Sequence, residues 1–109
     1  MRANEQMMLI SRLQDWFGSQ CNEDWEHSFG FRLETLDNPG WTFEADLAET
    51  QWADVVIARQ RVDRTESDWL QFEICQGKYM ASGGVFNLVE MLKNFFDVLD
   101  ELRDANQRN

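Results

Sequence analysis

Residues 29–47, FGFRLETLDNPGWTFEADL, contain the clearest structural pattern of the chain. Residues 29–36 alternate, with Phe31 and Leu33 on one side and Arg32 and Glu34 on the other, which is typical of a half-buried strand. Residues 37–40 predict a turn, because proline presets φ for a turn position and glycine accepts the positive φ that follows. The second strand places four apolar side chains inward: Trp41, Phe43, Ala45 and Leu47. We therefore predict a β-hairpin.

The faces of the two strands also predict their register. If Asp37 lies opposite Trp41, apolar side chains meet apolar ones across the pair, and three residues form the loop. The same register sets Glu34 directly opposite Glu44 on the outer face. Like charges in this position cost stability unless a cation comes near, so the hairpin is predicted to carry a small electrostatic conflict.

Helical spacing marks both ends of the chain. Over residues 5–17 the apolar residues recur every three or four positions, which predicts an amphipathic helix with Asn4 as its N-cap and Gly18 just after its last turn. Residues 19–28 are polar and irregular, and we interpret them as an ordered loop anchored by Trp25. From residue 88 to residue 102 the helical spacing returns and predicts a long amphipathic helix that ends in a polar tail.

Three more strands are predicted between the hairpin and the last helix. Residues 52–62 read as a strand whose centre is buried on both faces, and residues 63–68 as a polar loop. Residues 69–75 alternate again, and the short turn Gln76-Gly77 leads into a strand over residues 78–81. Ser82-Gly83-Gly84 then breaks the sheet.

This order of elements predicts an α+β domain. We expect a mostly antiparallel sheet of about five strands, with the N-terminal and the C-terminal helix packed on one face. The other face of such a sheet is exposed to water and is free to meet a partner. A length of 109 residues fits one domain, residues 1–109, since single cores commonly enclose roughly 100 to 150 residues.

The charge balance excludes several classes of partner. Twenty acidic residues against ten basic ones give a net charge of −10, so phosphate backbones and anionic membranes would repel the chain. We therefore expect neither a nucleic acid nor a membrane as a partner. The chain has no run of roughly 20 apolar residues, and residues 1–6 are polar where a signal peptide would begin its apolar stretch, so a cytoplasmic location is predicted.

The residue types that commonly carry catalysis are sparse. His27 is the one histidine, and with Cys21 as its nearest cysteine it makes a poor zinc motif, because structural zinc sites use four ligands in recognisable pairs. Glu23 and Asp24 flank Cys21, and their negative charges oppose a reactive thiolate. Cys75 belongs to a predicted strand, and we interpret its side chain as part of the packing of that strand or as a residue at the end of the hairpin. We therefore predict no metal, no cofactor and no catalytic constellation. His27 is predicted to form a hydrogen bond within its own loop.

The acidic residues are unevenly placed. Residues 21–50 contain eight acids and one base, a local charge of −7. A surface of this kind steers a positively charged protein and fixes its orientation, whereas the plainer interpretation is a solvated face. The candidate binding residues lie in the loop and in the first hairpin: Glu23, Asp24, Glu26, His27, Glu34, Glu44, Asp46 and Glu49.

The ordered string of motifs resembles the immunity protein 53 family of bacterial polymorphic toxin systems. It consists of Cys21, residues 24–28 (DWEHS), Gly30, residues 34–41 (ETLDNPGW), Asp68-Trp69, Gly83-Gly84 and Leu88. The resemblance implies a small cytoplasmic protein that is made beside a toxin and protects the producing cell by binding it. Such a cognate toxin would have a basic surface, as a nuclease does. The chain departs from the expected pattern at Val85, where a proline would follow the two glycines.

Two other classes of function stay open at this point. One is a small enzyme centred on the Cys21–His27 loop, since some sequences of this type carry a sulfurtransferase-like label. The other is a structural module that forms a homo-oligomer through the apolar residues of the last helix.

Overall fold

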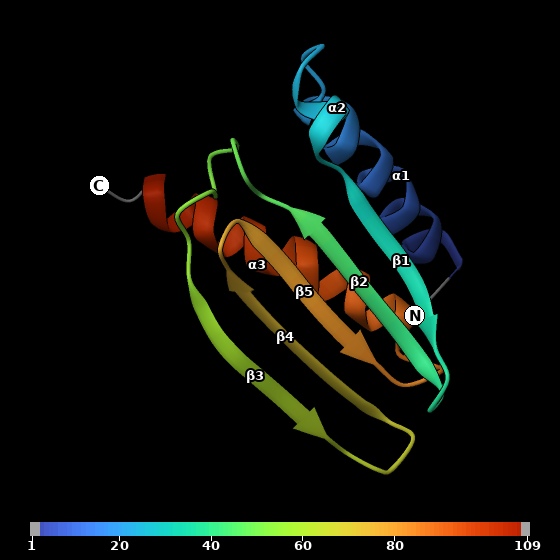
Figure 1. Ribbon diagram of the computed structural model, residues 1–109. Coiled ribbons are helices and arrows are strands. Elements are labelled where there is room, and N and C mark those ends of the chain that lie inside the picture. Colours follow the sequence, from blue (N-terminus) through green and yellow to red (C-terminus); the bar gives the residue numbers. More distant parts are fainter. Residues whose placement is uncertain (1–2, 108–109) are drawn as a thin grey trace.

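The computed structural model describes residues 3–107, which form two long helices, a short helix and five strands (Figure 1). Residues 1–2, at the start of the polar opening segment, and residues 108–109, at the end of the polar tail, lie outside this range. The elements, in chain order, are α1 (Ala3–Gln20), α2 (Trp25–Ser28), β1 (Phe31–Leu36), β2 (Gly40–Asp46), β3 (Ile57–Asp63), β4 (Trp69–Cys75), β5 (Lys78–Gly83) and α3 (Leu88–Gln107).

The five strands form one sheet in the order β1-β2-β5-β4-β3, and every neighbouring pair is antiparallel. The hairpins β1–β2 and β4–β5 meet side by side at β2 and β5, and β3 crosses to the far edge. The predicted α+β class is thus confirmed. Figure 1 shows α3 behind the sheet, with α1 at the side of β1.

The register of the first hairpin differs from the predicted one by two residues. Leu36 pairs with Gly40, so the loop consists of residues 37–39, and Glu34 lies opposite Thr42 rather than Glu44. The reason lies at Gly40, where an added Cβ would come within 2.3 Å of the carbonyl oxygen of Gly83 in β5. Gly40 is needed for this close approach between strands and is not one of the residues with positive φ.

This register removes the predicted conflict between like charges. Arg32 lies opposite Glu44, and its Nη2 is 3.4 Å from the Glu44 Oε2. Both strands keep the faces that the alternation predicted, because a shift of two residues preserves the side to which each side chain points.

The prediction for the third strand was wrong in its extent and its burial. Residues 51–54 form turns, and β3 begins only at Ile57. Six of its seven residues are exposed, because β3 is an edge strand with a register irregularity between Ile57 and Gln60. Trp52 is buried at 8% exposure, but it belongs to the core beneath the sheet and not to a strand.

The first helix is longer than predicted. It covers Ala3–Gln20, so Asn4 and Gly18 lie inside it and do not cap it. The helix ends where the amide of Cys21 donates to the carbonyls of Phe17 and Gly18. Beyond it, the predicted loop contains the four-residue helix α2, and Trp25 is the anchor that was expected, with 2% exposure.

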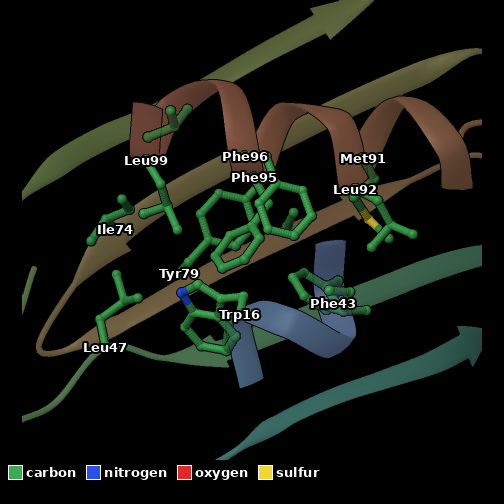
Figure 2. Close-up of a cluster of buried hydrophobic side chains, with 14 of the residues drawn as sticks. Trp16, Phe43, Leu47, Ile74, Tyr79, Met91, Leu92, Phe95, Phe96 and Leu99 are labelled. Carbon is green, nitrogen blue, oxygen red and sulfur yellow. The ribbon is translucent and has the colours of Figure 1, made fainter. Parts of the chain in front are cut away.

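The core lies between the sheet and the two long helices and is centred on Phe95 of α3 (Figure 2). The Phe95 ring centroid lies 4.9 Å from Tyr79, 5.2 Å from Trp16 and 5.3 Å from Phe43. Edge-to-face geometry of this kind contributes stability beyond area burial. The apolar stripe of α3 is buried here: Met91, Leu92, Phe95, Phe96, Val98 and Leu99. These residues are therefore not available for the oligomerisation through the last helix that was considered above.

The far end of the sheet depends on Gly84. A Cβ at this position would lie 2.1 Å from the carbonyl oxygen of Ser67 and 2.7 Å from Oδ1 of Asn87. Asn87 is buried, and its Nδ2 donates to Asp68 and to Glu90. The loop before β4 and the start of α3 are therefore locked together around this glycine.

Substituting Gly84 by alanine should lower the free energy of unfolding by about 1–3 kcal/mol, the usual cost of overpacking. The clash is with backbone, which cannot rotate away. Gly18→Ala is the matched control, because nothing lies within 4 Å of its Cβ position in α1. That variant should gain up to about 1 kcal/mol from the higher helix propensity of alanine. Urea denaturation measures both, and equal effects of the two variants would contradict the packing explanation.

Candidate functional site

The acidic loop between α1 and β1 is held by its own side chains. The Glu26 carboxylate accepts hydrogen bonds from the amides of Asn22 and Glu23, each at 2.9 Å. The Asn22 Oδ1 accepts from the amides of Asp24 and Trp25 at 3.0 and 2.8 Å. Glu23 has a φ of 74°, and these bonds hold its backbone in that uncommon conformation. The loop is therefore a fixed structure despite its polar composition.

Glu26 has a structural role within this loop. Hydrogen bonds from its own backbone amide and from the amides of Asn22 and Glu23 lower its pKa, because they stabilise the charged carboxylate. By contrast, Glu23 and Asp24 are exposed, and among residues 3–107 no hydrogen bond to their side chains is found. The loop thus uses one carboxylate to fix the backbone and presents two others to solvent.

Trp25 brings Glu49 to the same region. Its ring is buried, and its Nε1 donates to the carbonyl of Ala48 at 2.9 Å, which joins α2 to the turn after β2. Glu49 follows Ala48 directly, is exposed and has a φ of 58°. We refer to Glu23, Asp24 and Glu49 as the loop acids.

The acids of the first hairpin continue from this loop along the open face of the sheet. The amide of Gly30 donates to Oδ2 of Asp46 at 3.0 Å, and the amide of Asp46 donates to the carbonyl of Gly30 at 2.9 Å. Asp46 and Glu44 line a shallow groove with residues 28–32. Glu34 lies further along β1, opposite Thr42. We refer to Glu34, Glu44 and Asp46 as the sheet acids.

Cations interrupt the sheet acids. Arg32 forms an ion pair with Glu44, and Lys78 lies opposite Asp46 in the neighbouring strand. Further across the open face, Arg59 pairs with Glu73 at 3.0 Å. The predicted negative surface thus consists of two groups, the loop acids and the sheet acids, and cations lie among the sheet acids. The loop acids are the more strongly negative group, because His27 is the one basic side chain within residues 21–31.

His27 and the two cysteines do not form a reactive centre in the part of the chain that is described. His27 is exposed and makes no side-chain hydrogen bond there, so it is not bonded into its loop as predicted. Cys21 and Cys75 are free thiols, and the Sγ of Cys21 donates to the carbonyl of Phe17 at 3.3 Å. Within residues 3–107 no three His, Cys, Asp or Glu side chains are grouped as a metal site requires.

Sequence reasoning missed a second surface at the opposite end of β1. Here Pro39, Trp69 and Val85 line a groove of about 320 Å³, and the Nε1 of Trp41 donates to the Val85 carbonyl at 2.8 Å. Phe86, next to Val85, is 94% exposed. The sequence contained a sign of this surface, because Phe86 lies between the break at Ser82-Gly83-Gly84 and the apolar stripe of the last helix.

These features define a class of protein: a small acidic α+β domain whose loops are fixed so that charged side chains face outward. No helix within residues 3–107 combines the length and the apolar composition that crossing a bilayer requires. The family model described as immunity protein 53 matches residues 10–100. Since this match covers most of the chain, the protein belongs to the immunity protein 53 family, and the family implies a role in immunity against a toxin. No curated protein and no solved structure matches the chain.

Replacing Glu26 by glutamine should loosen the acidic loop. The lowered pKa of Glu26 means that its contribution to stability is complete above the pKa of an unfolded glutamate and is lost as the pH falls through the folded value. At neutral pH the amides of Asn22 and Glu23 should therefore exchange faster in Glu26→Gln than in the parent chain. As a control, the exchange of core strand amides should be unchanged. Unaltered exchange at Asn22 and Glu23 would show that the carboxylate does not hold the loop.

Proposed function

We propose that this chain binds and neutralises a cognate toxin through its acidic surface. The single observation that carries the proposal is the arrangement of the loop acids: Glu23, Asp24 and Glu49 are exposed while the backbone beneath them is held by Glu26, Asn22 and Trp25. A surface fixed before binding loses little conformational entropy when a partner docks. Electrostatic complementarity then steers a basic partner and fixes its orientation.

The sheet acids would extend this contact. Glu44 and Asp46 border the groove beside residues 28–32, close to the end of α2, so a partner that contacts the loop acids can also reach them. His27 and Glu26 belong to the same loop; His27 is free to contact a partner, whereas Glu26 supports the loop from within.

A toxin with a nucleic-acid substrate fits this surface best. An enzyme that binds nucleic acid presents a basic groove to the phosphate backbone. An acidic protein seated over such a groove would exclude the substrate by charge and by bulk. In this proposal the protein acts in the cytoplasm of the producing cell and acts by binding alone, without a catalytic step of its own.

Reversing the loop acids tests the proposal. The triple variant Glu23→Lys, Asp24→Lys and Glu49→Lys changes only exposed side chains, so the thermal unfolding temperature should stay near that of the parent chain. Protection of cells that express the toxin encoded next to the gene should be lost, and affinity for an inactive toxin variant should fall at least about 100-fold, which corresponds to roughly 2.7 kcal/mol.

The matched control reverses three exposed acids on the helices, Asp15, Glu101 and Asp104. It changes the net charge by the same amount, so it should retain most of the protection. If the loop variant protects as well as the control does, the acidic loop is not the toxin contact. Loss of protection in Phe86→Ser instead would place the contact at the opposite end of the sheet.

Removing the imidazole separates binding from catalysis. His27→Ala should fold and should still protect cells from the toxin, because an exposed side chain at one position of a charged surface contributes little to affinity on its own. Protection is measured as the survival of toxin-expressing cells, with Cys21→Ser as a parallel variant. Complete loss of protection with retained toxin binding would favour an enzyme centred on this loop.

A further inference from the structure

β1 is an edge strand whose outer side is unpaired. β1 is first in the strand order, and within residues 3–107 no other strand pairs with its outer side. Five of its six residues are exposed, including Phe31 at 36% and Leu33 at 39%. A strand edge of this kind offers a row of free backbone donors and acceptors to another strand.

The hydrogen bonds to β2 show which backbone groups face outward. The amide of Asp46 donates to the carbonyl of Gly30, so the backbone of Gly30 faces β2. Because this orientation alternates along an antiparallel strand, Arg32 and Glu34 also bond to β2. The N–H and C=O groups of Phe31, Leu33 and Thr35 therefore point away from the sheet.

The other edge strand of the sheet, β3, is protected against pairing with a further strand, unlike β1. β3 carries a register irregularity between Ile57 and Gln60, and its outward charges Arg59 and Arg61 are engaged with Glu73 and Asp63. Bulges and charges are the usual devices that prevent edge pairing. β1 has a regular register throughout and contains no proline.

We propose that β1 pairs in antiparallel fashion with β1 of a second copy of this chain, with Leu33 on the two-fold axis. In this register Leu33 faces Leu33 of the partner, and Phe31 faces Thr35 of the partner. All of these residues have outward backbone groups, so three opposed pairs can exchange six hydrogen bonds. Two five-stranded sheets would then join into one continuous sheet.

The charges of β1 select this register over its neighbours. With Leu33 on the axis, Arg32 lies opposite Glu34 of the partner twice, once on each side of the axis. Moving the axis to Glu34 would oppose Glu34 to its own copy, and moving it to Arg32 would oppose Arg32 to its own copy. Opposite charges across a pair of strands stabilise it and like charges destabilise it, so the strand is complementary to itself in one register. Among the described residues Glu34 has no ion-pair partner within its own chain.

Apolar side chains beside β1 fit the same partner. Figure 1 shows α1 running antiparallel to β1 along this edge, and Phe17 of α1 lies 6.0 Å from Phe31, ring centroid to centroid. Ile10 stands seven residues before Phe17, on the same side of the helix. Ile10 and Met7 are 61% and 71% exposed, and Leu33 of β1 is also exposed. A two-fold pairing of β1 would bring the two copies of α1 toward each other and shield part of this apolar surface.

This inference goes beyond the proposed function and does not depend on it. The loop acids lie outside β1, so the pairing leaves Glu23, Asp24 and Glu49 exposed in both copies. Glu34 is the one sheet acid that the pairing would occupy. Self-association can therefore be tested without the toxin.

The experiment uses charge reversal and recombination. The purified full chain is analysed by sedimentation velocity at about 100 µM, well above a micromolar dissociation constant. The parent chain should sediment as a dimer. Arg32→Glu and Glu34→Arg should each shift the equilibrium toward the monomer, because every Arg32–Glu34 contact becomes a like-charge contact, and the dissociation constant of the dimer should rise by about tenfold or more.

An equimolar mixture of Arg32→Glu with Glu34→Arg should regain the dissociation constant of the parent dimer, because both opposed positions then carry opposite charges. This recovery cannot arise from a loss of the Arg32–Glu44 ion pair within one chain. The double variant Arg32→Glu, Glu34→Arg should dimerise for the same reason. Thermal unfolding of each variant verifies that the monomer is folded.

A backbone variant tests the strand pairing itself. Thr35→Pro removes an outward N–H group and leaves the hydrogen bonds to β2 in place, so it should abolish dimerisation while the chain stays folded. A parent chain that is monomeric at 100 µM overturns the proposal, and so does a mixture of the two charge variants that dimerises no more tightly than either variant alone. If the parent is monomeric and Thr35→Pro loses toxin binding, the β1 edge belongs to the toxin and not to a second copy.

Discussion

The packing of Phe95 against aromatic rings of α1, β2 and β5 holds the layers of the structure together. Its ring contacts Trp16 of α1, Phe43 of β2 and Tyr79 of β5, so one side chain of α3 joins the first helix to the two central strands. Tyr79 also accepts a hydrogen bond from Asn94 of α3 at 2.7 Å, which pairs its buried hydroxyl. Because both long helices pack toward this face, the opposite face of the sheet stays free of helices, and among the described residues no strand pairs with the outer edge of β1.

The acidic residues divide into supporting and presented groups. Glu26 and Asp46 accept hydrogen bonds from backbone amides and fix the entry to β1, while Asp68 and Glu90 accept from the buried Asn87 at the other end of the sheet. Arg64 forms ion pairs with Asp68 and Glu90, and the hydrogen bonds that Asp68 accepts from Arg64 and from Asn87 lower its pKa. The excess of negative charge in the sequence is thus partly structural. What remains for a partner is the smaller set that has no internal role, of which the loop acids are the most concentrated part.

The sequence predicted the faces of the strands well, because alternation and helical spacing are local patterns. The turn Gln76-Gly77 was also predicted, and both residues have positive φ, at 53° and 75°. The register of the first hairpin was not predicted correctly, because every shift by two residues keeps each side chain on the same face. The close approach that requires a glycine at position 40 involves Gly83, which lies far along the chain. The predicted burial of residues 52–62 was wrong for a related reason. Strand order is a tertiary property, and the sequence of an apolar strand at an edge resembles that of a strand at the centre. No local pattern separates Glu26 from Glu23, because only the folded loop shows which carboxylate faces inward.

The two surfaces proposed here are geometrically compatible. In an antiparallel pairing of β1 about Leu33, the start of each strand points to an opposite end of the joined sheet. Gly30 stands three residues before Leu33, so the two copies of Gly30 would be six residues apart along the strands, about 20 Å at the rise of an extended chain. The acidic loops precede Gly30 in the chain and extend away from the axis on each side. A dimer of this kind would therefore present two separate loop surfaces, each complete within one chain, and would bind one partner molecule at each end. The edge strand and the acidic loop could then be occupied at the same time.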